Sequence, residues 1–219
     1  MNGTKLVIIV AVAVLASGCS SLERSRSLAN PDTPPTAIAQ QVCSICHGME
    51  GNSVNPNFPR LAGQQPAYFT AQLTQFRSHN RSDPAGSEYM WGLSRSLTDE
   101  QIAGLAAYYA AQRPAAPAAP GAPDPAAATL VAEGQAIFEK GIADAKIPPC
   151  AACHGAKAQG NEAFPRLAHQ HADYLMKQLM VFQRTDERPE GSVMKTVAHD
   201  LTPRNIEAVA LYLQQLPAE

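Results

Sequence analysis

The stretch Cys43-Ser44-Ile45-Cys46-His47 decides the fold, and its spacing returns as Cys150-Ala151-Ala152-Cys153-His154. In each copy the two thiols lie about one helical turn apart on one face, and the imidazole follows directly. This C-x-x-C-H pattern is typical of covalent haem attachment, in which both thiols bond to vinyl groups and the histidine binds the iron. A redox-active C-x-x-C or half of a zinc site would leave both histidines unexplained. The sequence therefore predicts two covalently bound haem c groups.

The surroundings of the two motifs are also duplicated. Phe58-Pro59-Arg60-Leu61-Ala62 recurs as Phe164-Pro165-Arg166-Leu167-Ala168, and Gly86-Ser87 recurs as Gly191-Ser192 in the same order. Between the copies, residues 113–125 are rich in proline and alanine, which favours an extended, semi-rigid spacer. We therefore predict one domain over residues 36–112, a linker over 113–125 and a second domain over 126–219.

Both halves show helical spacing of apolar residues, and no strand pattern of useful length appears. Thr36 is expected to cap the helix that leads into the first haem motif, and Asp124-Pro125 is expected to open its counterpart. Core helices are expected over 66–76 and near 174–182, and each half should close with a helix, 98–112 and 202–216. The fold class predicted is all-α, with two domains related by duplication.

The N-terminus resembles an export signal. A single Lys5 precedes an apolar run over residues 6–16, which is too short to span a bilayer well. The ending Leu15-Ala16-Ser17-Gly18-Cys19 resembles a bacterial lipobox, so residues 1–18 are predicted to be a signal peptide and Cys19 a lipidation site. Ordinary cleavage nearby, with Cys19 free or removed, is the alternative. Residues 19–35 would then form a tether in the periplasm, and Ser20 in place of an aspartate favours the outer membrane.

Net charge is −2, with 17 basic and 19 acidic residues. This balance leaves no basic stripe for nucleic acid and no acidic tail. No nucleic-acid partner is therefore predicted. The five cysteines divide into two per haem motif plus Cys19, which leaves no pair that requires a disulfide.

The second axial ligand of each iron follows from aligning the halves. Met90 stands seven residues before Leu97, and Met194 stands seven before Leu201, both expected in a polar loop before the last helix. Met176 and Met180 align with threonines in the first half and are expected to fill gaps in the core. Met49 is too near His47 in the sequence to reach the opposite face of the haem. Four other histidines lack a counterpart and are expected at the surface or in hydrogen bonds: His79, His169, His171 and His199. Two iron sites closed by methionine favour electron transfer over catalysis.

The paired haem motifs, Phe-Pro-Arg-Leu-Ala segments and methionines resemble those of cytochrome c4, a family of exported proteins with two class I cytochrome c domains. The resemblance implies that the carbonyls of Pro59 and Pro165 accept the Nδ1 hydrogen bonds of His47 and His154. Arg60 and Arg166 would lie near haem propionates, with Tyr68 and Tyr174 as weaker candidates for the same contact. One departure is His169, where the first half has Gly63.

Three functions are compatible with this reading. The first is a carrier that takes electrons from a quinol:cytochrome c reductase to a haem–copper terminal oxidase. The second is a cytochrome subunit of a periplasmic dehydrogenase. The third is a dihaem peroxidase, which is disfavoured because that enzyme needs one open iron and both halves supply a methionine.

Overall fold

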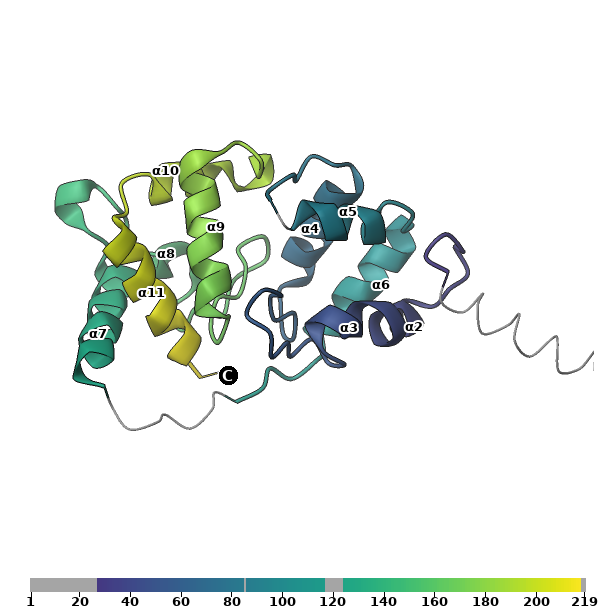
Figure 1. The fold of residues 1–219 in the computed structure, drawn as a ribbon, viewed down its shortest axis with the longest axis horizontal. Helices are drawn as coiled ribbons and strands as arrows, with labels where there is room; N and C mark the ends of the chain where they lie inside the picture. Colours follow the sequence, from purple (N-terminus) through teal and green to yellow (C-terminus); the bar gives the residue numbers. More distant parts are fainter. Residues whose placement is uncertain (1–26, 85, 117–123, 218–219) are drawn as a thin grey trace, which may run out of the picture.

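The structure is a computed structural model that describes residues 27–84, 86–116 and 124–217, and Figure 1 shows two helical bodies side by side. Within these ranges the only β-pairing consists of two isolated bridges, Ile142 with Ile147 and Asn161 with Phe164. The predicted all-α class is therefore confirmed. No helix in the described ranges is long and apolar enough to cross a membrane. The predicted signal peptide and Cys19 lie outside the described residues.

Domain 1 begins with one continuous helical segment that carries the first haem motif. It consists of α2 (Pro35–Ile38), a π-helical turn (Ala39–Cys43) and α3 (Ser44–His47). The expected cap at Thr36 is wrong, because Pro34 occupies the N-cap without a side-chain hydrogen bond and Pro35 forms the first helical position. Proline at that position is already held near the helical φ angle, so the helix starts without a capping side chain.

Three further helices complete domain 1: α4 (Pro66–Arg77), α5 (Ser87–Ser94) and α6 (Asp99–Ala110). The Thr98 side chain accepts a bond from the Gln101 amide, and the Gln101 side chain accepts one from the Thr98 amide, so the predicted capping box is present. The buried core includes Phe69 of α4, which stacks on Tyr109 of α6 at 5.4 Å between ring centroids. Helix α6 packs against both α2 and α4, and it thereby holds the segment that carries the haem motif in place.

Domain 2 repeats this arrangement with a longer first helix. Its elements are α7 (Pro125–Lys140), a 3-10 turn (Ala143–Ala145), α8 (Ala151–His154), α9 (Ala172–Arg184), a second 3-10 turn (Pro189–Gly191), α10 (Ser192–Ala198) and α11 (Pro203–Gln215). The Asp124 side chain accepts a bond from the Ala126 amide, which confirms the predicted start of α7. Gly141 ends α7 with a φ of 70°, so the chain turns into the additional loop before α8.

Helices α7 and α11 cross very closely at Gly134. A Cβ atom built at this position would lie 2.0 Å from the main-chain oxygen of Ala208, a distance that no side chain can occupy. Glycine therefore lets the two backbones approach directly. The crossing anchors α11, the last helix of domain 2, against α7.

Candidate functional site

The two motif histidines occupy equivalent positions at the C-terminal ends of α3 and α8. His47 is 8% exposed and His154 is 6% exposed. His47 Nδ1 lies 2.9 Å from the Pro59 carbonyl oxygen, and His154 Nδ1 lies 3.0 Å from the Pro165 carbonyl oxygen. Since a carbonyl can only accept, Nδ1 carries the proton in both rings and Nε2 keeps its lone pair. Each ring thus presents Nε2 as a ligand for a metal.

Burial also keeps these imidazoles neutral. Loss of solvation lowers the pKa of His47 and of His154 by more than the hydrogen bond to the proline carbonyl raises it. Both histidines are therefore uncharged at neutral pH, the state in which imidazole coordinates iron.

No disulfide pairs the motif cysteines among the described residues. Burial raises the pKa of Cys43 and of Cys150 to about 11, so these thiols stay protonated at neutral pH. In the described parts of the chain, no group of three or more His, Cys, Asp or Glu side chains could hold a metal ion. Within those parts, the zinc interpretation is therefore disfavoured, because a zinc site needs three or four such ligands.

Met90 and Met194 lie in helices, and their expected placement in loops is wrong. Met90 belongs to α5 and Met194 to α10, because Gly86 and Gly191 are each followed by serine at the start of a short helix. Met90 packs against the domain 1 core together with Cys43, and Met194 packs against the domain 2 core together with Cys150. Each core thus combines an apolar lining, a protonated thiol, a neutral imidazole and a thioether, which fits a covalently held haem.

The other methionines and histidines that were considered as iron ligands have different surroundings. Met176 packs against the domain 2 core, as expected of a gap-filler, but Met180 is 36% exposed, so its expected core role is wrong. His169 Nδ1 bonds to the Gln214 carbonyl oxygen at 3.1 Å, and His171 Nε2 bonds to the Ser53 carbonyl oxygen at 2.9 Å. His79 and His199 are exposed, so all four histidines lie at the surface or in hydrogen bonds, as expected.

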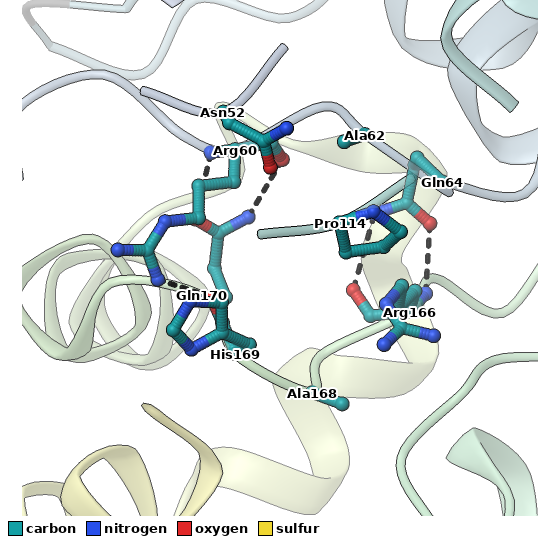
Figure 2. A pocket seen from close by; sticks show the side chains of 9 residues that line it. All are labelled: Asn52, Arg60, Ala62, Gln64, Pro114, Arg166, Ala168, His169 and Gln170. Atoms are coloured by element: carbon teal, nitrogen blue, oxygen red, sulfur yellow. Dashed lines mark hydrogen bonds between the residues drawn. The ribbon is translucent and has the colours of Figure 1, made fainter. Parts of the chain in front are cut away.

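Two glutamines join the domains through matched pairs of hydrogen bonds (Figure 2). Gln64 accepts from the Arg166 amide at 2.7 Å and donates to the Arg166 carbonyl at 3.1 Å. Gln170 accepts from the Arg60 amide at 2.8 Å and donates to the Arg60 carbonyl at 2.9 Å. The equivalent residues of the two copies therefore exchange equivalent bonds, which relates the domains by an approximate twofold axis.

The arginines of this contact point along the domain boundary. The Arg60 guanidinium donates to the carbonyl oxygens of Ser53 and His169, and the Arg166 side chain is buried. Burial lowers the pKa of both guanidinium groups. The cavity that they line with Gln64 and Gln170 measures about 10 Å³, so it holds no more than one water molecule.

A second polar cluster lies deeper between α4 and α9, and the sequence reasoning missed it. Arg81 donates to Gln72 at 2.6 Å and to Gln178 of the other domain at 3.3 Å. Arg188 makes the mirrored contacts, to Gln178 and to Gln72 at 2.9 Å. Gln72 and Gln178 are spaced like the other repeated residues, so the alignment of the two halves could have found this pair.

Asp83 is the most deeply buried charge of this cluster, with no solvent exposure, and it forms an ion pair with Arg81 at 2.6 Å. Burial alone would raise the pKa of Asp83, but the charge of Arg81 and hydrogen bonds from Arg81 and Gln178 lower it overall. Asp83 is therefore ionised at neutral pH and fixes Arg81 at the domain boundary.

A sequence profile of the cytochrome c family matches this chain twice, over residues 36–111 and 131–217. The chain belongs to the cytochrome c family. The two matches each contain one C-x-x-C-H helix, one proline carbonyl contact to its histidine and one of the two aligned methionines. The predicted pair of tandem cytochrome c domains is therefore confirmed.

Curated relatives place the chain with the dihaem cytochrome c4 proteins. It is 36% identical to cytochrome c-552 of Acidithiobacillus ferridurans over 89% of this chain and 82% of that protein. It is 36% identical to cytochrome c4 of Azotobacter vinelandii over 80% of this chain and 84% of that protein. It is also 35% identical to a thiosulfate dehydrogenase electron acceptor of Thiomonas intermedia, over 84% of this chain and 81% of the relative.

Solved structures agree with these matches. Cytochrome c4 of Acidithiobacillus ferrooxidans is 38% identical, with a TM-score of 0.71 over 80% of this chain and 98% of that one. The thiosulfate dehydrogenase of Marichromatium purpuratum is 33% identical, with a TM-score of 0.68 over 90% of this chain and 40% of that one. This cytochrome c4 homologue thus carries two covalently bound haem c groups and is an electron-transfer protein rather than an enzyme.

Proposed function

We propose that this cytochrome carries electrons between respiratory partners in the periplasm, from a quinol:cytochrome c reductase to a haem–copper terminal oxidase. The observation that carries the proposal is the repetition of one set of candidate ligands. Each domain has a buried neutral histidine, bonded to a proline carbonyl, and a methionine packed against the domain's core. An iron held by both side chains would leave a substrate no position on the metal, which suits electron exchange.

The proposed ligands follow from this geometry. Haem c would supply a reversible one-electron iron couple, and the residues that would hold its iron are His47 and Met90 in domain 1 and His154 and Met194 in domain 2. Four cysteines would hold the two groups covalently: Cys43, Cys46, Cys150 and Cys153. The carbonyls of Pro59 and Pro165 fix the orientation of each imidazole and make it a better electron donor to iron.

Arg60 and Arg166 are proposed to lie near the haem propionates, since both sit at the domain boundary with partly desolvated guanidinium groups. Tyr68 is proposed for the same contact, and its hydroxyl already accepts a hydrogen bond from Arg188 at 3.3 Å. Tyr174 occupies the equivalent place in α9. Anionic propionates buried at this boundary would need donors of this kind.

A second candidate function is to accept electrons from a periplasmic dehydrogenase. The specific observation in its favour is the 35% identity to a protein named as the electron acceptor of thiosulfate dehydrogenase, which covers most of both chains. The structural match to a thiosulfate dehydrogenase adds to it. Carrier and acceptor share the same haem sites and differ only in the protein that supplies the electrons.

Stopped-flow spectroscopy separates the two candidates. Reduced holoprotein mixed with membranes of the parent bacterium should be oxidised in a cyanide-sensitive reaction, and quinol added to the same membranes should reduce it again. Purified thiosulfate dehydrogenase with thiosulfate is the second donor. Reduction by the dehydrogenase together with no reduction by quinol would replace the first candidate with the second. A holoprotein inert toward both donors and the oxidase would contradict the proposed function.

We further propose that a lipid on Cys19 holds the mature protein at a membrane, with the outer membrane favoured by Ser20. The support is the lipobox-like sequence from Leu15 to Cys19. The intact mass of the mature protein tests this anchor, since acylated Cys19 adds the mass of the attached chains. A mass equal to the bare polypeptide plus two haems would contradict it.

A further inference from the structure

Tyr109 of α6 is buried against the segment that carries the first haem motif. The residue has no solvent exposure. Its ring stacks on Phe69 at 5.4 Å and meets Tyr108 edge-on at 5.0 Å between centroids. A Cβ atom built at Gly51 would lie 2.8 Å from the same ring, so the loop after the motif closes on it directly. The ring is therefore held on three sides, and its hydroxyl has a fixed position.

The Tyr109 hydroxyl reaches the π-helical turn Ala39–Cys43 at two points. It donates to the Ala39 carbonyl oxygen at 3.5 Å, which is long for a hydrogen bond. That carbonyl has another donor, because it also accepts from the Ser44 amide. The second hydrogen-bond partner of the hydroxyl is the Cys43 sulfur. Tyr109 therefore links α6 to the first cysteine of the motif.

Attachment of haem would fix the direction of this second hydrogen bond. As a thiol, Cys43 has a proton of its own and can either donate or accept. As a thioether it has none, and its sulfur can only accept. Burial raises the pKa of Tyr109, so the hydroxyl keeps its proton at neutral pH. The hydroxyl is then the donor of the pair.

Domain 2 has no hydroxyl in this place. The Gly63 amide donates to the Tyr109 carbonyl at 2.9 Å, and the His169 amide donates to the Leu213 carbonyl at 2.8 Å. Gly63 and His169 are equivalent in the two copies, so Tyr109 and Leu213 are equivalent as well. Since leucine packs in the same position of the same fold, folding does not require the hydroxyl. Its presence beside Cys43 alone calls for an explanation in the chemistry of the first haem.

We propose that the Tyr109 hydroxyl donates a hydrogen bond to the sulfur by which Cys43 holds the first haem, and that this bond raises the reduction potential of that haem. The inference rests on the attachment proposed for Cys43 and adds a residue that makes the two haems unequal. A donor at the sulfur withdraws electron density from the edge of the haem, and the positive end of the O–H dipole points toward the sulfur. Both effects favour the ferrous state, which carries one positive charge less. Because the site is fully buried, water does not screen the dipole.

The test removes the hydroxyl and keeps the ring. In Tyr109→Phe the equilibrium constant for reduction of one haem should fall about threefold or more, which is roughly 30 mV or more at ~59 mV per tenfold change. The other haem should keep its potential. The matched control is Tyr108→Phe, since the Tyr108 hydroxyl also donates to a main-chain carbonyl, that of Met49 at 3.1 Å, on the loop after the motif. The control should leave both potentials unchanged.

A redox titration with soluble mediators identifies the haem that responds. The potential lowered in Tyr109→Phe should be the one that Met90→Ala lowers, because Tyr109, Met90 and Cys43 belong to the same core. A shift of the potential that Met194→Ala lowers would overturn the proposal. Equal shifts of both potentials, a rise, or no shift at all would overturn it as well.

Resonance Raman spectroscopy of the wild type gives a second readout that does not depend on the folding of a variant. Where a haem sulfur accepts from a hydroxyl, its carbon–sulfur vibrations should shift after long equilibration in heavy water, since the hydroxyl proton is exchanged. Tyr108→Phe should keep this shift, and folded Tyr109→Phe should lack it. A wild-type spectrum that is identical in both solvents would overturn the proposal.

Failure of the proposed function would be visible in a different measurement. Soluble mediators report the potentials without a biological partner. A wild type inert toward both donors and the oxidase would remove the proposed function, while a lowered potential in Tyr109→Phe would still support the role of Tyr109. Cys43→Ala should leave one free vinyl group per chain in the pyridine haemochrome spectrum, where the wild type has none. Equal spectra of the two proteins would remove the attachment at Cys43, and the inference with it.

Discussion

Replacement of Met90 by Ala should lower one of the two midpoint potentials by on the order of 100 mV, within the ~0.8 V range over which axial ligands tune haem iron. Thioether sulfur stabilises ferrous iron relative to ferric, so its loss favours the oxidised state. Met90 packs against the core that contains Cys43, whereas Met194 packs against the other core. Met194→Ala should therefore lower the other potential. A redox titration followed by visible absorbance measures both.

Met180→Ala is the matched control, since Met180 is 36% exposed on α9 and no ligand role is proposed for it. Its two potentials should equal those of the wild type. If neither potential moved in Met90→Ala, or if both fell together, the assignment of one methionine to each haem would be wrong.

Replacement of Asp83 by Ala should reduce the free energy of unfolding by about 3–5 kcal/mol, since it leaves the Arg81 guanidinium buried without its counter-charge. Arg81 is 4% exposed, Asp83 is fully buried, and the pair bridges to Gln178 of the other domain. The loss should also weaken the contact between domains. Guanidinium chloride unfolding of the holoprotein, followed by circular dichroism at neutral pH, measures the change.

The pH dependence has a defined sign. The folded pKa of Asp83 lies below its usual value, so its contribution to stability is present above the unfolded pKa of about 3.9 and is lost as the pH falls through the lower folded value. As the pH falls through this acidic range, the free energy of unfolding should therefore decrease less in Asp83→Ala than in the wild type.

Asp186→Ala provides the control, because Asp186 pairs with Lys195 at the surface with 85% of its side chain exposed. An exposed pair of this kind contributes roughly 0–1 kcal/mol. Equal losses in Asp83→Ala and Asp186→Ala would show that the buried pair does not hold the domains.

Most of the fold could be predicted from the sequence, because the chain contains two copies of one domain. Each helix expected in one copy could be compared with its counterpart in the other. The capping box at Thr98 and the start of α7 after Asp124 depend on local bonds, and local bonds leave a sequence pattern. The predicted cap at Thr36 was wrong because Pro35 starts the same helix one residue earlier, without a capping hydroxyl. The methionine helices α5 and α10 were missed since short segments beginning with Gly-Ser look like loops.

The resemblance implies that the two domains pack about a pseudo-twofold axis, but the residues that make the contact were not predicted, although they are repeated. Gln64 meets Arg166 across 102 positions of sequence, and Gln178 meets Asp83 across 95. Glutamine and arginine are usually solvated, so their types alone do not indicate burial. Only the assembled pair of domains brings their donors and acceptors together, where each contact satisfies a group that would otherwise be costly to bury.

The central claim is that both irons are closed by histidine and methionine, so that the protein transfers electrons without binding a substrate. The far-red absorption of the ferric holoprotein tests it most directly, because the weak sulfur-to-iron band appears only where a thioether is bound. We predict a band at the intensity of two haems, unchanged by added peroxide. A band at the intensity of one haem or none, together with peroxide turnover, would contradict the claim.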